Sequence, residues 1–216
     1  MQPERAALPE PDVPASWLAL GDSYTIGEGV PEAARWPNQL AARLDQQGIA
    51  VSPPRILATT GWTAAELSAA MDREEPLGLW SLVSLLIGVN DQYRGRSPDD
   101  FRPAFCALLS RAITLAQGRA GLVLVLSIPD WGQTPFATEQ GRDSRDVSDR
   151  IDAFNAVVHE ESRRRGCAWV DVTGIGRERG GQPDMLVVDG LHPSAAMYAL
   201  WADQACPAAR AALLTR

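Results

Sequence analysis

The sequence predicts an α/β protein, a three-layer α/β/α sandwich around a five-stranded parallel sheet. Short apolar runs alternate along the chain with longer stretches of helical periodicity, so that each strand connects to the next through a helix. Two of these runs are apolar almost throughout, which is typical of strands that are covered by helices on both faces. Glycine and polar residues follow the strand ends, and in a parallel sheet these ends gather at the ligand-binding edge.

Three strands and two helices are predicted in the first part of the chain. In order, they are the strand Trp17–Leu20, the helix Ala34–Gln47, the strand Arg55–Ala58, a helix from Thr63 to about Arg73, and the strand Ser81–Ile87. Gly21 stops the first strand, and Gly48 ends the first helix, whose apolar residues lie on one face. Thr63 caps the second helix, and Glu66 three residues later completes a capping box.

The second part of the chain predicts two more strands and three helices. They are the helix Pro98–Gln117, the strand Leu122–Ile128, the helix Ser144–Arg165, the strand Trp169–Val172 and a last helix that begins at Pro193. Ser97 opens the first of these helices as its N-cap. Pro193 suits the first helical position, where its missing N–H costs nothing, and Pro207 is expected to break the last helix in two. Pro129–Arg142 and Gly174–Asp184 are predicted to be loops.

Length and composition indicate one globular domain. The chain has 216 residues, of which 45% are hydrophobic and 22% charged, enough for one substantial core. We expect residues 15–216 to form this domain and the charged, proline-rich residues 1–14 to form a flexible N-terminal arm. The formal net charge of −7 argues against a nucleic-acid partner, because phosphate binding needs a basic surface. The sequence predicts no particular oligomeric state.

The cysteines and the hydropathy of the chain bear on its location. Cys106, Cys167 and Cys206 form no closely spaced pair and cannot all pair within the chain, which favours free thiols in a reducing compartment. No stretch of about 18 apolar residues is long enough to span a membrane, and residues 1–14 lack the apolar core of a signal peptide. The sequence therefore predicts a cytoplasmic protein without integral membrane association.

Three side chains near the two ends of the chain are of the types needed for nucleophilic catalysis. A serine hydroxyl is a poor nucleophile unless an imidazole takes its proton and a carboxylate orients that imidazole. Ser23 follows the first strand, and Asp189 and His192 lie near the C-terminus. The alternatives are a helix cap at Ser23, and a surface turn with a helix cap at Asp189 and His192. His159, the other histidine, lies within a predicted helix and is expected to be a solvated structural residue.

Two further positions are candidates to stabilise an anion that forms at such a serine. Gly61 follows the second strand, where its N–H would face the anion without a side chain in the way. Asn90 follows the third strand and offers a side-chain amide. The alternatives are a turn glycine and an asparagine that makes a local Asx turn. The neighbouring Asp91 is expected to pair with nearby backbone or with Arg94.

Bulky apolar residues near these positions predict a substrate pocket. The candidates after the strand ends are Trp62, Tyr93, Trp131, Phe136 and Val188. Aromatic side chains combine a large apolar surface with defined shape, which suits the wall of a small-molecule pocket. The alternative for Trp131 and Phe136 is that their loop folds back and fills its own core.

The motifs together resemble those of the SGNH (GDSL) hydrolase superfamily and its bacterial GDSL-type esterases and lipases. Gly21-Asp22-Ser23, Gly61, Gly88-x-Asn90-Asp91 and Asp189-x-x-His192 match the four sequence blocks of the family in order. The resemblance implies a flavodoxin-like three-layer fold and ester hydrolysis without a metal or other cofactor. It implies Ser23 as nucleophile, His192 as base and Asp189 as the acid that orients the base. The amides of Ser23 and Gly61 and the side chain of Asn90 would form the oxyanion hole.

The resemblance leaves the substrate and the fate of the acyl group open. Tyr24 replaces the leucine or isoleucine that is frequent after the family's serine, and it would bring a phenol near the site. The absence of a long lipid-binding stretch favours small or soluble acyl or acetyl esters over bulk lipid. The alternatives are an acyltransferase or thioesterase with the same triad, and a non-catalytic carbohydrate- or lipid-binding module. A metal hydrolase fits poorly, because the chain has two histidines and no HExxH motif.

Overall fold

The computed structural model describes residues 13–182 and 184–215, and its five strands form one sheet. The strand order is β2-β1-β3-β4-β5, and every neighbouring pair is parallel. The strands are β1 (Trp17–Gly21), β2 (Arg55–Ala58), β3 (Leu82–Leu86), β4 (Val123–Leu126) and β5 (Ala168–Val170). Each overlaps a predicted apolar run, and the predicted five-stranded parallel sheet is confirmed. The chain leaves β1 toward β2 and then returns to β3 on the other side, which is the flavodoxin-like order.

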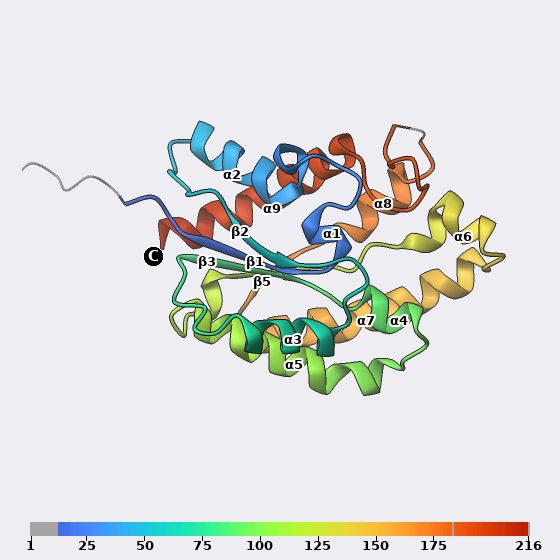
Figure 1. Cartoon of the computed structure of the whole chain (residues 1–216), viewed down its shortest axis with the longest axis horizontal. Helices are drawn as coiled ribbons and strands as arrows, with labels where there is room; N and C mark the ends of the chain where they lie inside the picture. Colours follow the sequence, from blue (N-terminus) through green and yellow to red (C-terminus); the bar gives the residue numbers. More distant parts are fainter. Residues whose placement is uncertain (1–12, 183, 216) are drawn as a thin grey trace, which may run out of the picture.

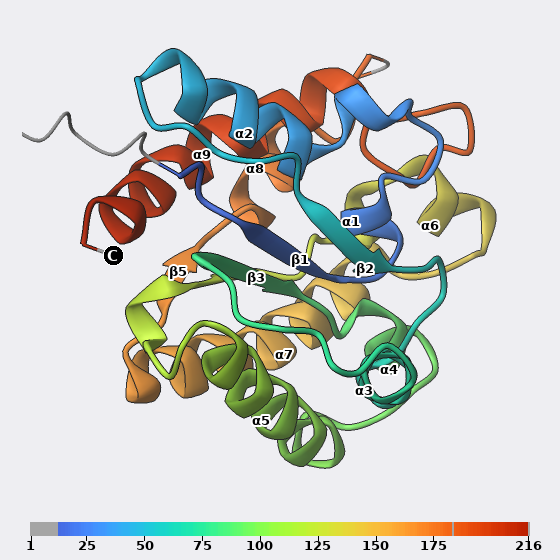
Figure 2. The same ribbon diagram turned by 60° about the vertical axis from the view of Figure 1, so that its left-hand side comes forward.

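Helices cover both faces of the sheet, as Figures 1 and 2 show. One face carries α2 (Trp36–Gln46) and α9 (Ala195–Leu214), and the other carries α3 (Ala64–Arg73), α5 (Pro98–Leu115) and α7 (Ser144–Arg165). Because both faces are covered, β1, β3 and β4 are buried along their whole length. The predicted three-layer α/β/α sandwich is confirmed.

Short helices occupy the connections around the sheet. They are α1 (Ser23–Ile26), η1 (Glu32–Ala34), α4 (Val89–Tyr93), η2 (Ala120–Leu122), η3 (Trp131–Gln133), α6 (Pro135–Glu139) and α8 (Thr173–Arg179). Figure 1 shows α1, α4 and α6 at the same end of the sheet. The neighbouring strands β1 and β3 stop at this end. The strand order reverses between these two strands. Ligands of open parallel sheets bind at such a point.

Large aromatic residues fill the space between the sheet and the helices. Trp17, Trp36 and Trp201 are fully buried, whereas Trp80 and Trp169 are half-buried against the core. The indole N–H of Trp17 donates to the Ser84 hydroxyl at 3.1 Å, so the polar edge of this buried ring is satisfied on the neighbouring strand.

The helix starts follow local side-chain chemistry. Thr63 and Glu66 form the predicted capping box, with the Thr63 amide donating to the Glu66 carboxylate at 2.8 Å. Ser97 accepts from the Asp100 amide at 3.1 Å and opens α5 as predicted. Gly166 ends α7 in the left-handed conformation that glycine adopts most readily.

The structure corrects two expectations about the last helix. Ser194 is the N-cap of the last helix, which begins at Ala195 and not at Pro193. Pro207 lies inside α9 and does not divide it, because the helix is packed on both sides of the proline through residues such as Cys206 and Ala209.

The two segments predicted to be loops also contain helices. Residues 129–142 include η3 and α6, and residues 174–184 begin within α8. These helices are too short to show a helical period in the sequence, which explains why they were missed.

The first described residues extend the sheet region, and the arm expected over residues 1–14 lies mostly outside the described residues. Ala15 donates to the Ala50 carbonyl at 2.8 Å and accepts from the Ser52 amide at 2.9 Å. This backbone pairing lies next to the start of β1. Within residues 13–182 and 184–215, no helix has both the length and the hydropathy needed to cross a bilayer.

Candidate active site

A cavity of about 180 Å³ opens where β1, β2 and β3 end. Residues from segments far apart in the chain line it together. Ser23 and His192 contribute a hydroxyl and an imidazole, and Gly61 and Asn90 line the cavity as well. These four residues follow β1, precede α9, follow β2 and follow β3, respectively. The cavity therefore brings together four of the candidate site residues from separate segments, whereas Asp189 does not line it.

Ser23 occupies the first turn of α1, directly after β1. The Oδ1 atom of Asp22 caps this turn by accepting from the Tyr24 amide at 3.0 Å. Gly21 is required at the end of the strand, because a Cβ there would lie 2.7 Å from the Leu86 carbonyl oxygen. The Ser23 amide belongs to the first turn of a helix, where an N–H has no acceptor within the helix. It is thus a donor suited to an anion in the cavity.

Asp189 and His192 form a compact turn with an ion-pair geometry. The Nδ1 atom of His192 lies 2.6 Å from Oδ2 of Asp189. The other carboxylate oxygen accepts from the amides of Leu191 and His192 at 2.8 and 2.9 Å. Gly190 has a φ of 66°, a conformation that favours glycine and lets the chain turn between the two side chains. The carboxylate is therefore held by three donors, all within three residues of it.

Electrostatics keep this carboxylate charged. Burial opposes ionisation of Asp189, but the hydrogen bonds from the His192 ring, the His192 amide and the Leu191 amide outweigh it and lower the pKa. The His192 side chain is 10% exposed, and its ring packs at 5.6 Å from the ring of Tyr24. An imidazole with Nδ1 bonded to a carboxylate presents its Nε2 atom as the proton acceptor.

The turn after β2 is held by α4. The Asn90 amide donates to the Trp62 carbonyl at 3.0 Å, which uses one of its two hydrogens. Arg94 donates to the Gly61 carbonyl at 2.8 Å and also pairs with Glu66 at 3.2 Å. Gly61 has a φ of 85°, in the region that favours glycine. The hydrogen bonds from Asn90 in α4 and from Arg94 directly after it thus fix the peptide groups on the C-terminal side of Gly61.

Asp91 holds the residues that follow the same turn. Its buried carboxylate accepts from the Ala64 amide at 2.8 Å, at the start of α3. Its basic neighbour is Arg96 at 3.6 Å, whereas Arg94, the partner expected from the sequence, donates to the Gly61 carbonyl instead. Burial raises the pKa of Asp91, although the Ala64 amide and the charge of Arg96 oppose this rise.

Three aromatic rings form the apolar wall of the cavity. Tyr93, Trp131 and Phe136 line it, with ring centroids 5.3 Å apart for Tyr93 and Trp131 and 6.1 Å apart for Trp131 and Phe136. The Trp131 indole N–H donates to the Gln92 side-chain oxygen at 2.8 Å. Trp131 is only 3% exposed. The ring is thus buried in its own loop and also lines the cavity, and its contact with a substrate stays a prediction.

A model of the GDSL-like lipase/acylhydrolase family matches residues 19–200. The match spans most of the chain and includes Ser23, Asn90 and His192. The chain belongs to this family. The resemblance seen in the sequence motifs is confirmed, and this GDSL hydrolase is a carboxylic ester hydrolase in its general activity.

Solved structures share the fold of the GDSL hydrolase. A lipase/acylhydrolase from Enterococcus faecalis matches with a TM-score of 0.72 and 17% identity, over 91% of this chain and 96% of that chain. The acetylxylan esterase Axe2 from Geobacillus stearothermophilus matches with a TM-score of 0.67 and 19% identity, over 90% and 94%. Phospholipase A1 from Streptomyces albidoflavus NA297 matches with a TM-score of 0.67 and 19% identity, over 92% and 99%. A search among curated proteins found no match.

The remaining residues that the sequence analysis selected divide between the cavity and its surroundings. Tyr24 lines the cavity of the GDSL hydrolase, and its ring packs against the rings of His192 and Trp201, with centroids 5.6 and 6.0 Å away. Trp62 does not line the cavity and packs half-buried against the core. Val188 is fully exposed, at a turn that directs its side chain to solvent.

Sequence reasoning missed three residues that line the cavity. They are Thr60, Val89 and Leu191. Each is adjacent in the chain to a residue that was selected or to its motif, and this adjacency was the available signal. Thr60 also donates to the carboxylate of Glu28, so a carboxylate lies beside the cavity.

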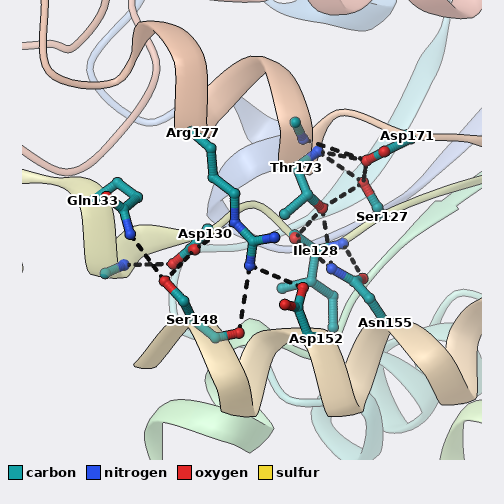
Figure 3. Close-up of polar contacts among 12 residues, drawn as sticks. Ser127, Ile128, Asp130, Gln133, Ser148, Asp152, Asn155, Asp171, Thr173 and Arg177 are labelled. Atoms are coloured by element: carbon teal, nitrogen blue, oxygen red, sulfur yellow. Dashed lines mark hydrogen bonds and ion pairs between the residues drawn. The ribbon is translucent and has the colours of Figure 1, made fainter. Parts of the chain in front are cut away.

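Figure 3 shows a polar cluster that fastens the loop between β4 and α6 of the GDSL hydrolase. Asp130 is buried and accepts from the Gly132 amide at 2.9 Å, from the Ser148 hydroxyl at 2.6 Å and from the Arg177 guanidinium at 2.8 Å. Arg177 also reaches Asp152 on α7 at 2.8 Å. The cluster ties η3 to α7 and α8, and Trp131 is the first residue of η3.

Asn155 fixes the start of the same loop. It accepts from the Ile128 amide at 2.7 Å and donates to the Ile128 carbonyl at 3.0 Å (Figure 3). In the part of the chain that the structure describes, no group of three or more histidine, cysteine, aspartate or glutamate side chains has the arrangement of a metal site.

Proposed function

We propose that this GDSL hydrolase cleaves carboxylic esters with Ser23 as nucleophile, His192 as general base and Asp189 as the carboxylate that orients the base. One observation carries the proposal. Ser23 and His192 line the same cavity, while the His192 ring is paired at 2.6 Å with Asp189. A histidine held in this way has one nitrogen committed to the carboxylate and the other available for a proton from a hydroxyl.

The reaction would proceed through an acyl-enzyme. His192 takes the proton of the Ser23 hydroxyl as its oxygen attacks the ester carbonyl, and a tetrahedral anion forms. Imidazolium then protonates the leaving alkoxide, and the C–O bond to the alcohol breaks. Water, activated by the same imidazole, attacks the acyl-enzyme and releases the acid. The Asp189 carboxylate, with its lowered pKa, stays charged and stabilises the imidazolium.

Three donors are proposed to hold the tetrahedral anion. They are the amides of Ser23 and Gly61 and the second N–H of the Asn90 side chain. All three residues line the cavity, and Asn90 is oriented by its bond to the Trp62 carbonyl. Loss of one such donor costs about 3 to 4 kcal/mol of transition-state stabilisation in hydrolases.

The dimensions of the cavity favour small esters. Its volume of about 180 Å³ lies below the range of roughly 300 to 1,000 Å³ that is usual for drug-sized ligands. Besides the polar groups, its lining consists mainly of aromatic and aliphatic side chains. We therefore propose a short acyl group as the occupant of this space.

Kinetics of two variants test the proposal. Ser23→Ala and His192→Ala are expected to lower kcat on p-nitrophenyl acetate by about 10⁴-fold or more with the fold retained, because each removes a step of the proton transfer and attack. Ser110→Ala, at an exposed serine on α5, is the matched control. Full activity of the Ser23→Ala enzyme would contradict the assignment. Release of the free acid in water, without an added acceptor alcohol, separates hydrolysis from acyl transfer.

A further inference from the structure

A second and smaller cavity lies behind the active-site cavity. Its volume is about 20 Å³. Tyr24, Trp131 and Leu191 line both cavities, so these three residues form the wall between the two spaces. Residues at or near α8 and α9 form the far side of the second cavity, and they are Gly176, Gly180, Leu186, Pro193, Met197 and Trp201.

Trp131 is the part of this wall that stands apart from the proposed catalytic residues. Tyr24 follows Ser23 and packs on the His192 ring at 5.6 Å, and Leu191 directly precedes His192. Trp131 comes from a different segment, the start of η3. It is therefore the wall residue that can be changed with the least effect on the groups that carry out the reaction.

The Trp131 ring is held in place at both its polar and its apolar edges. Its indole N–H donates to the Gln92 side chain at 2.8 Å in a buried environment. Its ring packs edge-on against Tyr93 and Phe136, with centroids 5.3 and 6.1 Å away. A rotation that opened the wall would leave a buried donor without an acceptor and would break both ring contacts.

The backbone that carries Trp131 is fixed as well. Its two neighbours in the chain are Asp130 and Gly132. The Gly132 amide donates a hydrogen bond of 2.9 Å to the Asp130 carboxylate. The same carboxylate is held by Ser148 and Arg177, as Figure 3 shows. Gly132 lies so close to α7 that a Cβ there would be 2.8 Å from the Cβ of Val147. Opening the wall by a side-chain rotation or by a loop shift would therefore cost hydrogen bonds and packing contacts.

We infer that Trp131 is the partition that limits the acyl group of the substrate to a short chain. The inference rests on the proposed ester hydrolysis at Ser23 and deepens it by naming the residue that sets chain length. With Trp131 in place, the acyl group is confined to the cavity of about 180 Å³. Without the indole, that cavity joins the second space. Apolar side chains and glycines at or near α8 and α9 border this space, together with Pro129, Asp130 and Thr134 from the loop after β4.

The residues around the second cavity determine how much a longer acyl chain is expected to gain in kcat/KM. Met197, Leu186 and Pro193 offer apolar contact to an alkyl chain, and Gly176 and Gly180 leave room beside it. Each methylene that becomes buried there is expected to raise kcat/KM about fourfold. Two additional buried methylenes therefore predict an increase of about 16-fold for a longer ester relative to a short one.

The test compares kcat/KM for p-nitrophenyl octanoate and p-nitrophenyl acetate. For Trp131→Ala, the ratio of the octanoate to the acetate value is expected to exceed the unmodified enzyme's ratio by about 16-fold or more. Trp131→Leu, which removes less of a buried side chain, serves if the alanine variant does not fold, and it is expected to shift the ratio in the same direction. An unchanged ratio in a folded variant would overturn the inference.

Phe136→Ala is the matched control. It removes an aromatic ring from the same wall, but Phe136 does not border the second cavity. Its ratio is expected to change much less than that of Trp131→Ala. If the two variants shift the ratio equally, simple widening of the cavity explains the effect and the partition is contradicted.

A binding measurement separates this inference from the proposed function. The measurement uses the Ser23→Ala background, because binding does not require turnover. The Ser23→Ala/Trp131→Ala variant is expected to bind decanoate at least about tenfold more tightly than Ser23→Ala alone, as measured by calorimetry. Tighter binding supports the partition even if ester hydrolysis proves not to depend on Ser23. Equal decanoate affinities with and without the indole would overturn the partition, whatever the kinetics of Ser23→Ala show.

Discussion

Asp22 shows how an unusual environment arises beside the proposed nucleophile. The side chain is fully buried, and its Oδ1 atom accepts from the Tyr24 amide at 3.0 Å. Its Oδ2 atom is buried without a hydrogen-bond partner among the described residues. Burial raises the pKa of Asp22 to about 8, a rise that the Tyr24 amide opposes and the negative charge of Asp91 reinforces. Asp22 is therefore a neutral acid at pH 7.

This neutral acid predicts a pH dependence of stability. The pKa of Asp22 is higher in the folded chain than the value of about 3.9 expected on unfolding, so the group binds its proton more tightly when folded. Its contribution to stability is complete below about pH 4 and is lost as the pH rises through about 8. In Asp22→Asn, which keeps the acceptor for the Tyr24 amide, the fall in unfolding free energy between pH 5 and pH 8 is expected to be smaller.

Urea denaturation at several pH values measures this effect. The slope that a single such group adds is at most about 1.4 kcal/mol per pH unit. Asp45→Asn, at an exposed position of α2, is the control and is expected to follow the unmodified protein. Parallel curves for the Asp22→Asn and unmodified proteins would show that Asp22 does not hold a proton in the folded state.

Arg94 is proposed as a positioning residue for the oxyanion donors. It fixes the Gly61 carbonyl and the Glu66 carboxylate, while Asn90 fixes the next carbonyl along the turn. Arg94→Met is expected to lower kcat about tenfold with little change in KM, because a misdirected donor weakens the transition state more than substrate binding. Arg94→Lys, which retains a donor, is expected to recover part of the loss.

Arg111→Met is the control for the Arg94 variants. Arg111 pairs with Asp72 and Glu75 and so joins α5 to residues in and just after α3, away from the cavity. Steady-state kinetics on p-nitrophenyl acetate with circular dichroism as a check on folding would distinguish the two sites. An equal loss of kcat in Arg94→Met and Arg111→Met would mean that both act only through the anchoring of α3.

At the scale of elements, the sequence predicted the features that depend on residues near in the chain, such as helix caps. It missed the features that depend on contacts between distant residues. The caps at Thr63 and Ser97 join groups three residues apart, and so the pattern alone reveals them. The continuation of α9 through Pro207 depends on packing against other elements, which no local pattern contains. For η3 and α8, the cluster of Figure 3 supplies contacts between residues remote in the chain.

The cluster around Asp130 predicts a stability effect at this scale. Arg177→Met leaves the buried Asp130 carboxylate without its cation, and we expect a loss of about 2 to 3 kcal/mol in unfolding free energy. Arg55→Met, at an ion pair with Glu74 in which both side chains are exposed, is expected to lose less than about 1 kcal/mol. Urea denaturation gives both values. Equal losses would show that the cluster adds no more than a surface ion pair does.

At the scale of the molecule, the topology explains why scattered motifs meet. In a parallel sheet all strands end at one edge, so Ser23, Gly61 and Asn90 were expected to gather there once five strands were predicted. The approach of His192 follows because α9 packs against the same sheet after the Asp189 turn. The shape of the cavity could not be predicted, since the positions of Trp62 and Val188 depend on side-chain packing that the sequence pattern does not contain.

Covalent labelling with a fluorophosphonate, followed by peptide mass spectrometry, tests the central claim most directly. The reagent forms a stable adduct with a serine only where a base has activated the hydroxyl and donors hold the resulting anion. We expect a single adduct on the peptide that contains Ser23, and at least a 100-fold slower reaction in His192→Ala. An adduct on another serine, or labelling of Ser23 that proceeds equally well without His192, would contradict the account.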